Sequence, residues 1–245
     1  MGEGVVRALQ LAGARVVIAD IDVDGGTAVA DRAGEGVSFS STDITDDAAL
    51  DALAADVAAR HGGIDVLVNL ACTYLDDGFA TSRADWLTAL NVNLVSAVRA
   101  TRAVYPWLVR SDAAGIVNVT SISSKVAQTG RWVYPVSKAA MVQLTRSMAM
   151  DLAGDGIRVN SVSPGWTWSK IMDDLSGSNR AKTDAVAAPF HLTGRVGDPL
   201  EVGAVIAFLA SAAASVVTGA DWAADGGYSA MGPEQSVPAI PQLSS

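Results

Sequence analysis

The sequence has very few of the residues that build disulfides and zinc sites: one cysteine, Cys72, and two histidines among 245 residues. A single cysteine excludes an intramolecular disulfide and is typical of an intracellular protein. A His/Cys zinc site is disfavoured as well, because such a site needs several of these ligands. We therefore expect a cytoplasmic protein that binds no metal.

Basic residues are also few, since 17 Lys and Arg stand against 26 Asp and Glu and the formal net charge is −9. A nucleic-acid partner requires a basic face, so we expect none to bind. An anionic small molecule is not excluded, because backbone N–H groups at a helix start can hold a phosphate without any basic side chain.

The N-terminus lacks the basic and apolar regions of a secretory signal. The uncharged run 202–220 is close to the length of a membrane span, but it is rich in Ala, Ser, Gly and Thr. It follows Asp198, Pro199 and Glu201, which suit the N-cap, N1 and N3 positions of a helix. We interpret the run as a buried helix, a turn and a strand, and we expect no membrane partner.

What the chain does contain is an alternation of short apolar runs with helical segments. Near-continuous apolar strands that alternate with helices indicate a parallel sheet covered on both faces. Right-handed crossovers then favour a doubly wound, Rossmann-type α/β fold. The runs predict strands at 14–20, 64–71, 114–121, 157–165 and 220–227, and helices at 46–63, 84–109, 134–156 and after Asp198.

One pair of residues suggests acid/base chemistry. Tyr134 and Lys138 lie four residues apart at the start of a predicted helix, so they share a face. A nearby ammonium favours the phenolate and lowers the pKa of a tyrosine, which would make Tyr134 a general acid/base near neutral pH. The spacing alone is weak evidence, because Tyr and Lys meet in this way on many surface helices.

Two further polar residues strengthen this interpretation. Ser121 ends a predicted strand thirteen residues before Tyr134, and ligands of doubly wound sheets bind at the carboxyl ends of strands. Asn93 lies within the long predicted helix 84–109. An Asn inside a helix is usually solvated or locally bonded, but the "VNL" context suggests a buried polar group with a functional task.

Together these motifs resemble those of the short-chain dehydrogenase/reductase family, and the resemblance runs from Gly2 to about Tyr228. It implies one NAD-binding catalytic domain at 1–231, followed by a flexible or subunit-contacting tail at 232–245. It also implies a homotetramer or homodimer, and hydride transfer between a nicotinamide cofactor and an alcohol or carbonyl carbon.

The family's catalytic set is a Ser, a Tyr-x-x-x-Lys and an Asn in a "VNL" context, which here are Ser121, Tyr134, Lys138 and Asn93. The resemblance implies that Tyr134 exchanges a proton with the substrate oxygen and that Ser121 orients this oxygen. It implies that Lys138 holds the cofactor ribose and that Asn93 positions a water in a proton relay.

Asp20 bears on the choice of cofactor. It ends the strand whose carboxylate, in a Rossmann sheet, accepts hydrogen bonds from a ribose diol. This carboxylate would repel a 2′-phosphate, and no Lys or Arg follows it in "DIDVDGG", so we expect NAD rather than NADP. The alternative is that Asp20 only caps the turn. The full set of expected cofactor contacts is Gly2, Asp20, Ile21, Asp43, Ile44, Asn69, Ala71, Tyr134, Lys138, Pro164, Gly165, Thr167 and Ser169.

Some of these positions match the family's pattern only in part. Asn69 and Ala71 match its N-N-A-G segment, whereas Leu70 and Cys72 depart from it. Cys72 replaces a glycine close to the cofactor; we interpret it as a packed, inert residue rather than a catalytic thiol. The family's nicotinamide-contacting threonine corresponds to Ser169, with Thr167 two residues earlier, and either hydroxyl could reach the carboxamide.

Aromatic side chains suggest the substrate class. The segment 166–191 should form a lid, and aromatic residues bury large areas, so we expect an apolar, cyclic or aromatic secondary alcohol or ketone. The alternative is that half of them pack the lid or a subunit contact, and we interpret His191 as a solvated loop residue. The expected substrate-lining residues are Tyr74, Trp132, Trp166, Trp168 and Met172.

The resemblance also exposes a gap at the start of the chain. The family opens with a strand and T-G-x-x-x-G-x-G, and Met1-Gly2 corresponds to the last x-G of that motif. A missing central strand would leave two inner strands with unpaired backbone groups. We therefore expect Met1 to be an internal methionine, and we expect the chain as written to fold poorly and bind cofactor weakly.

Two other functions stay open at this point. The same Tyr/Lys pair could serve an epimerase or dehydratase with a tightly held nucleotide. The altered "NLAC" segment and the abrupt start are also compatible with a catalytically silent nucleotide-binding scaffold. The complete set of catalytic side chains favours the dehydrogenase.

Overall fold

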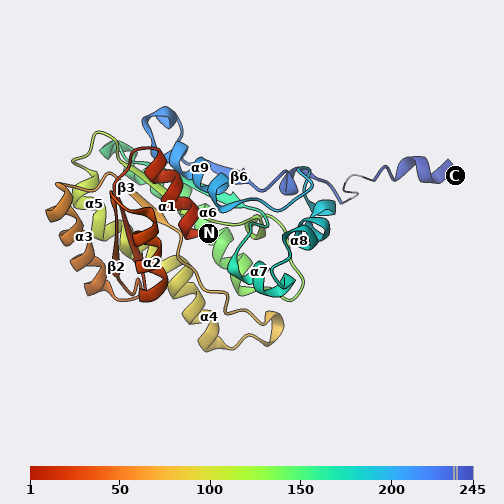
Figure 1. Ribbon diagram of the computed structural model, residues 1–245. Helices are drawn as coiled ribbons and strands as arrows, with labels where there is room; N and C mark the ends of the chain where they lie inside the picture. Colours follow the sequence, from red (N-terminus) through yellow and green to blue (C-terminus); the bar gives the residue numbers. More distant parts are fainter. Residues whose placement is uncertain (234, 236, 245) are drawn as a thin grey trace.

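The computed structural model describes residues 1–233, 235 and 237–244 (Figure 1). Strands and helices alternate through most of the chain, as the apolar runs predict. The strands are β1 (Val16–Asp20), β2 (Val37–Ser41), β3 (Val66–Asn69), β4 (Gly115–Val119), β5 (Arg158–Pro164) and β6 (Asp221–Ala224). The α-helices are α1 (Gly2–Leu11), α2 (Val23–Ala33), α3 (Asp47–His61), α4 (Arg83–Leu90), α5 (Ser96–Leu108), α6 (Val133–Leu152), α7 (Lys170–Ser176), α8 (Arg180–Ala187) and α9 (Pro199–Ala210).

All strand pairs are parallel, but the strands form two separate sheets. β1 pairs with β2, and a second sheet has the order β3-β4-β5-β6. Among the described residues no strand joins β1 to β3, so each of them has a strand neighbour on one edge only. The division falls where the resemblance places a first strand. The parallel pairing and the alternating order confirm the predicted Rossmann-type α/β fold.

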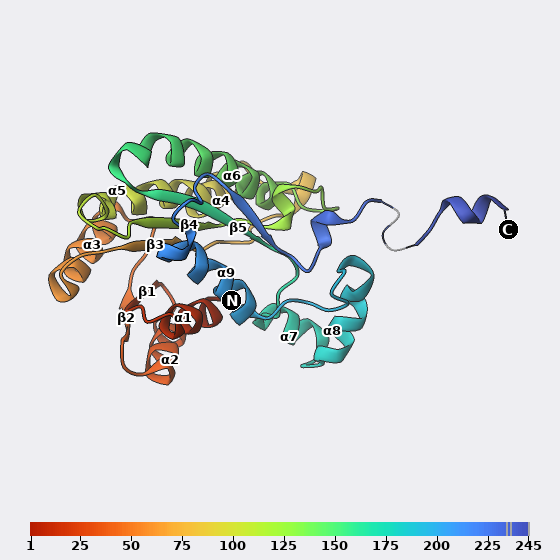
Figure 2. The same ribbon diagram turned by 90° about the horizontal axis from the view of Figure 1, so that it is seen from above.

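Helices cover both faces of the four-stranded sheet, as Figure 2 shows. On one face, α3, α5 and α6 bury an apolar cluster that includes Leu50, Leu108 and Met148, packed against Ile116 and Val159 of the strands. The alternation of side chains along a strand sends neighbouring residues to opposite faces. One β-strand therefore supplies both layers of the core.

On the other face, α9 and α1 pack together over the sheet. Val117, Val119 and Val162 of the strands meet Val202 and Ile206 of α9 in this second cluster. The two helices approach closely because the contact is made by glycines: a Cβ on Gly203 would lie 2.6 Å from the carbonyl oxygen of Gly4. This contact locates the start of α1 beside the sheet.

The remaining segments lie at the edges of this core. α7 and α8 form a small helical layer beside the carboxyl ends of the strands (Figure 1). Ile240–Ser244 form a short 3-10 helix that lies away from the body of the molecule. The run 202–220 folds as the predicted helix and turn, leading into β6. In the described part of the chain, no helix has the length and apolarity needed to cross a bilayer.

Candidate active site

Three of the predicted catalytic residues come together where β4 ends. Ser121 follows β4 and precedes a short 3-10 helix, Ile122–Ser124. Tyr134 lies in the first turn of α6, and Lys138 lies one turn later. All three side chains are buried, with exposed fractions of 9% for Ser121 and Tyr134 and 2% for Lys138. The Ser121 hydroxyl donates a hydrogen bond of 3.1 Å to the Ser123 hydroxyl, and its proximity to Tyr134 lowers the pKa of that phenol.

Lys138 is held by the strand beside it. Its ammonium donates a hydrogen bond of 2.8 Å to the carbonyl oxygen of Val119 and lies 5.6 Å from the centroid of the Tyr134 ring. Burial lowers the pKa of Lys138 from its ordinary value, and the nearby Cys72 raises it by less. The side chain therefore has a defined position, with one donor used by the protein backbone.

We expected the pKa of Tyr134 to be lowered, and for the chain by itself this expectation was wrong. Burial raises the pKa of Tyr134 above its ordinary value, and Cys72 raises it further. Hydrogen bonds with Ser121 and Tyr74 lower it by less. The physical reason is that the phenol and the ammonium are buried in one cluster, where loss of water opposes the charging of either group.

Tyr74 lies directly against the candidate acid/base. Its ring stacks on that of Tyr134, with centroids 4.8 Å apart and an interplanar angle of 25°. Burial raises the pKa of Tyr74 as well, and the neighbouring Tyr134 and Cys72 raise it further by smaller amounts. Tyr74, which the sequence analysis assigned to the substrate site, thus covers one face of the Tyr134 ring.

Asn93 is buried, as its sequence context predicts, with an exposed fraction of 2%. It lies in a π-helical segment, Asn91–Val95, between α4 and α5, and such π-helical segments often occur at functional sites. The Asn93 Oδ1 accepts a bond of 2.7 Å from the Thr73 N–H, and Nδ2 donates to the Thr73 carbonyl. Nδ2 also donates to the Ser137 hydroxyl at 3.2 Å. Asn93 therefore connects the loop after β3 to α6.

Asp20 is exposed at the end of β1, with Ile21 after it at 71% exposure. One carboxylate oxygen, Oδ1, accepts a hydrogen bond of 3.0 Å from the Asp22 N–H. The turn-capping role considered for this residue is thus present. It uses Oδ1, so the exposed carboxylate can still meet a ribose.

Asp43 and Ile44 lie beyond β2, where the resemblance places adenine contacts. The Asp43 carboxylate accepts bonds of 2.8 and 2.7 Å from the N–H and hydroxyl of Thr45, and these bonds lower its pKa. Ile44 packs against the core cluster beneath α3. The side chains predicted to meet the adenine are thus already engaged with the protein.

The end of β3 carries Asn69, whose side-chain amide donates a bond of 2.8 Å to Asn118 on β4. Asn118 in turn donates to the hydroxyl of Thr145 on α6. Ala71 follows on the exposed side. The Asn69 side chain therefore ties two strands together, which leaves backbone groups of this segment for contact with a cofactor.

The segment after β5 approaches the residue that follows β6 very closely. A Cβ on Gly165 would lie 2.8 Å from the Cα of Asp225, so the approach of Pro164-Gly165 requires a glycine. The Thr167 hydroxyl donates to the Gly165 carbonyl at 3.3 Å, and the Ser169 hydroxyl accepts from the Met172 N–H at the start of α7. Both hydroxyls considered for the carboxamide contact are therefore used within the loop.

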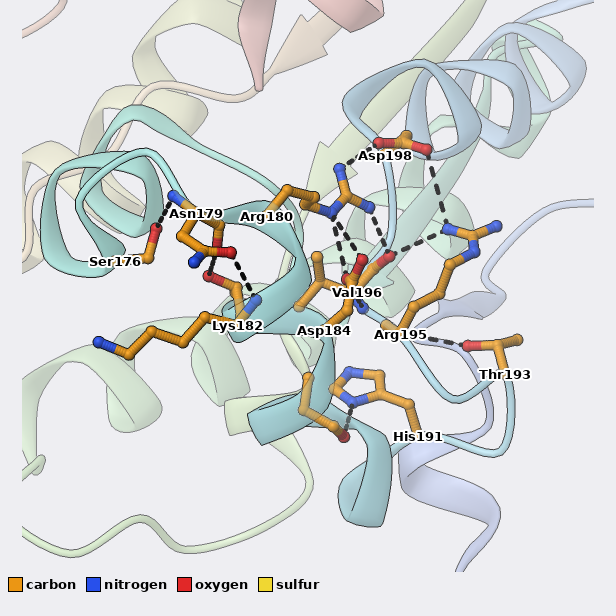
Figure 3. A network of polar contacts seen from close by, with 12 residues as sticks. Ser176, Asn179, Arg180, Lys182, Asp184, His191, Thr193, Arg195, Val196 and Asp198 are labelled. Atoms are coloured by element: carbon orange, nitrogen blue, oxygen red, sulfur yellow. Dashed lines mark hydrogen bonds and ion pairs between the residues drawn. The ribbon is translucent and has the colours of Figure 1, made fainter.

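A network of ion pairs holds the predicted lid against the start of α9 (Figure 3). Arg180 on α8 pairs with Asp184 at 3.1 Å and with Asp198 at 2.8 Å, and it donates to the Val196 carbonyl. Its guanidinium also lies over the ring of Trp168, 5.1 Å from the centroid. One arginine thus connects the lid helix, the loop before α9 and a predicted substrate-lining residue.

The other lining residues divide into two groups. Trp166 packs against Phe190 within the lid, with ring centroids 5.9 Å apart, and Met172 lies on α7. Trp132 is half exposed at the start of α6 and meets Phe79 edge to face. Of the predicted lining residues, Tyr74 is the one that stacks on Tyr134.

His191 is not the solvated residue that we expected, since its exposed fraction is 3%. Its Nδ1 lies 2.9 Å from the Ala187 carbonyl, and its Nε2 accepts a hydrogen bond from the Trp166 N–H. Both ring nitrogens therefore bond to backbone groups of the lid. The sequence could not show this, because the contacts with Ala187 and Trp166 form only when the lid folds.

Comparison with known proteins agrees with this geometry. Residues 1–229 match a family model described as enoyl-(acyl carrier protein) reductase. A cis-4-hydroxycyclohexanecarboxylate dehydrogenase of Sinomonas cyclohexanicum is 36% identical over 242 residues, which cover 94% of this chain and 93% of the relative. A meso-2,3-butanediol dehydrogenase of Serratia marcescens is 34% identical, with 94% and 90% of the two chains covered.

This chain belongs to the short-chain dehydrogenase/reductase family. A solved short-chain oxidoreductase of Pseudomonas aeruginosa PAO1, described as NADPH-bound and containing an atypical catalytic centre, superimposes with a TM-score of 0.88. It is 27% identical, and the match covers 94% of this chain and 93% of that one. The short-chain dehydrogenase/reductase fold and oxidoreductase class are therefore shown for this chain.

A family member needs a place for a nicotinamide dinucleotide, and the residues present fit one. The first hydrogen bond in α1 runs from the Gly4 N–H to Met1, so the N–H groups of Gly2 and Glu3 have no acceptor within the helix. Such groups suit a phosphate. Asp20 and Gly165 lie at carboxyl ends of β1 and β5, where ligands of doubly wound sheets bind.

Sequence reasoning on this short-chain dehydrogenase/reductase missed Asp76. Its carboxylate accepts hydrogen bonds from the backbone N–H groups of Trp132 and Tyr134, more than fifty residues away. The one available signal was negative: no Ser, Thr, Asp or Asn immediately precedes α6, so its first turn needs a cap from elsewhere.

Proposed function

We propose that the protein transfers a hydride between NAD(H) and a secondary alcohol or ketone, with an apolar or cyclic substrate. The observation that carries the proposal is the buried cluster of Ser121, Tyr134 and Lys138 at the carboxyl end of β4. Two neighbouring hydroxyl groups and a buried ammonium form a site that can bind a carbonyl oxygen and exchange a proton with it.

In this proposal each side chain has a separate task. Bound nicotinamide supplies or accepts the hydride. In the direction of reduction, the Tyr134 hydroxyl donates its proton to the substrate oxygen while the Ser121 hydroxyl orients that oxygen. The raised pKa of Tyr134 in the chain alone suits the protonated, donating form. Lys138 holds the cofactor ribose and Asn93 supports the loop and helix around the proton path.

Asp20 supports NAD as the preferred cofactor. Its exposed carboxylate stands at the end of β1, and no basic residue follows in 21–26 to receive a 2′-phosphate. Repulsion between a carboxylate and a phosphate disfavours NADP. The NADPH named for the Pseudomonas structure belongs to that protein; whether the same cofactor serves here is decided by competition between NADH and NADPH.

The aromatic surroundings support the substrate class. Tyr74 covers Tyr134, while Trp166 and Trp168 lie on the lid, and aromatic rings favour apolar partners. The name of the Sinomonas relative describes a cyclic secondary alcohol as its substrate. We propose that a ring-bearing alcohol or ketone also fits this chain.

Exposed apolar side chains support assembly into a homotetramer or homodimer. Met150 and Val216 are 83% and 92% exposed, and burial of such side chains between subunits stabilises an oligomer. Sedimentation of the purified protein measures this directly, and a monomer at micromolar concentration would contradict it.

The deciding experiment follows absorbance at 340 nm with a panel of cyclic and open-chain ketones and both reduced nicotinamide cofactors. We expect NADH oxidation with cyclic ketones. Tyr134→Phe should lower kcat by about a thousandfold while the Kd for NADH changes less than twofold. Turnover that survives Tyr134→Phe would assign the proton transfer to another group. Tight nucleotide binding with no absorbance change on any ketone would contradict the dehydrogenase.

A further inference from the structure

The helix that carries Tyr134 has no N-terminal cap of its own. Trp132 occupies the N-cap position of α6, and no side-chain hydrogen bond caps the helix there. The first turn of an α-helix leaves its N–H groups without intrahelical acceptors. For α6, this turn carries the candidate acid/base, so whatever satisfies these groups also determines where Tyr134 lies.

One carboxylate from another part of the chain takes this role. The Asp76 Oδ1 accepts a hydrogen bond of 2.9 Å from the Trp132 N–H, and Oδ2 accepts one of 2.8 Å from the Tyr134 N–H. Pro135 has no N–H, and the Val136 N–H already bonds to the Trp132 carbonyl. The free N–H groups of the first turn therefore converge on Asp76.

The same loop also contacts the tyrosine ring. Asp76 Oδ1 accepts a further bond of 3.0 Å from the Gly78 N–H, which closes the loop on itself. Two residues before Asp76, Tyr74 stacks on Tyr134. The loop after β3 thus holds Tyr134 at two points, its backbone N–H and its ring.

The charge of Asp76 suits this position. Partial burial raises the pKa of Asp76, but backbone N–H groups of Trp132, Tyr134, Gly78 and Val133 outweigh this effect and the pKa lies below its ordinary value. The side chain is therefore an anion at neutral pH. An anion at a helix N-terminus is favoured by the helix dipole.

We propose that Asp76 is a positioning residue for the reaction: it holds the first turn of α6 so that the Tyr134 hydroxyl stays beside Ser121 and Lys138. Asp76 acts through backbone N–H groups and touches neither substrate nor cofactor. The kinetic consequences rest on the function proposed above, whereas the placement of Tyr134 does not.

The kinetic test compares Asp76→Asn with Asp77→Asn. Asp77 is the exposed neighbour, and the exchange removes the same charge one residue away. We expect Asp76→Asn to lower kcat by about tenfold to a hundredfold, as small misplacements of catalytic groups do. KM for NADH should stay within twofold, and Asp77→Asn should match the wild type in both.

The pH profile separates positioning from a simple charge effect. A displaced Tyr134 loses part of the burial that is the largest influence raising its pKa, so the pH midpoint of kcat should move down in Asp76→Asn. Asp77→Asn removes the same charge without freeing the first turn of α6, and its midpoint should match that of the wild type. A midpoint that moves down in Asp76→Asn alone supports the proposal; equal midpoints in the two variants, or an upward shift, overturn it.

A measurement without turnover keeps the proposal testable if the hydride-transfer function fails. The chain has four tyrosines, so ¹³C-tyrosine labelling gives four signals, and Tyr134→Phe assigns the one of interest. In Asp76→Asn this signal should lose the ring-current shift that Tyr74 causes, with native circular dichroism retained. Asp76→Ala, which removes both acceptors, should lose at least as much of this shift. A Tyr134 signal unchanged from the wild type would overturn the proposal, whatever the activity.

Discussion

The ring of Tyr74 lies flat on the ring of Tyr134, with 4.8 Å between their centroids. The two phenols come from the loop after β3 and from the first turn of α6, sixty residues apart in the chain. The stack covers the candidate acid/base on one face, and burial is the largest influence that raises the pKa of Tyr134. Tyr74 is therefore part of the environment that sets how readily this phenol releases its proton.

Tyr74→Phe tests this relationship. The substitution keeps the stack but removes the hydroxyl whose hydrogen bond lowers the pKa of Tyr134. The pH midpoint of alcohol oxidation should move up, and the rate at neutral pH should fall by about tenfold or less. Tyr105→Phe, which removes a surface bond to Asp155, is the control. Equal midpoints in both variants would show that the Tyr74 hydroxyl has no such influence.

A double substitution at the end of β1 tests the basis of cofactor choice. Asp20→Ser removes the carboxylate that would repel a 2′-phosphate, and Ile21→Arg offers a cation that can bind it bidentately. We expect the ratio of kcat/KM for NADPH to that for NADH to rise by about tenfold, since two exposed charge effects each contribute about threefold. The control Asp24→Ser, which removes a carboxylate from an exposed residue nearby, should leave the ratio unchanged. A constant ratio in the double variant would place cofactor selection elsewhere.

Arg180→Met tests whether the ion-pair network holds the lid. The exchange keeps an unbranched side chain but removes the bonds to Asp184, Asp198 and Val196 and the contact with Trp168. We expect a loss of about 2 kcal/mol in the free energy of unfolding and a several-fold higher KM for the ketone, with KM for NADH unchanged.

Lys170→Met is the matched control on the same lid. Lys170 pairs with Asp174, and the two side chains are 85% and 59% exposed. An exposed pair of this kind contributes little to stability. Equal effects of the two substitutions on the KM for ketone would show that the network has no special role in the lid.

Asp221 gives the protein a predictable dependence on acid. Its side chain is 8% exposed and pairs with Lys125 at 3.0 Å, and it accepts bonds from Ser161 and Ser163. Partial burial raises the pKa of Asp221, but these hydrogen bonds and the charge of Lys125 lower it by more. The pKa of Asp221 therefore lies below its ordinary value. The folded state therefore favours the anion more than the unfolded state does.

The sign of the pH effect follows from this shift. Asp221 stabilises the fold fully above the unfolded pKa of about 4, and this contribution disappears as the pH falls through the lower folded pKa. Asp221→Asn should cost about 2 kcal/mol at pH 7 and flatten the decline in stability below about pH 4. Urea unfolding at several pH values measures both; a decline as steep as that of the wild type would assign acid sensitivity to other carboxylates.

Most of the order of strands and helices was predictable because its signals are local, although β2 (Val37–Ser41) was not among the predicted strands. Val16–Asp20 and Gly115–Val119 are short apolar runs, and both form buried or half-buried parallel strands. Asp198, Pro199 and Glu201 predicted the start of α9, which begins at Pro199. The pairing of β1 with β2 alone also follows the expectation that a strand between β1 and β3 is lacking.

The candidate site was predictable as a set of residues but not as an environment. The spacing of Tyr134 and Lys138 on one helix and the position of Ser121 after a strand can be read from sequence. The upward pKa shift of Tyr134 could not, because it depends on burial and on the proximity of Cys72 in the folded chain. His191 was misjudged for the same reason, since its bonds to Ala187 and Trp166 form only when the lid folds.

By itself the sequence determined the fold class, the helical face shared by the phenol and the amine, and the charge at the end of β1, since these depend on periodicity and on neighbouring residues. Tertiary structure alone decided which groups surround the phenol and that Asp76 caps its helix from the loop after β3. Such contacts join residues far apart in the chain, and a linear pattern carries no record of the distance between them.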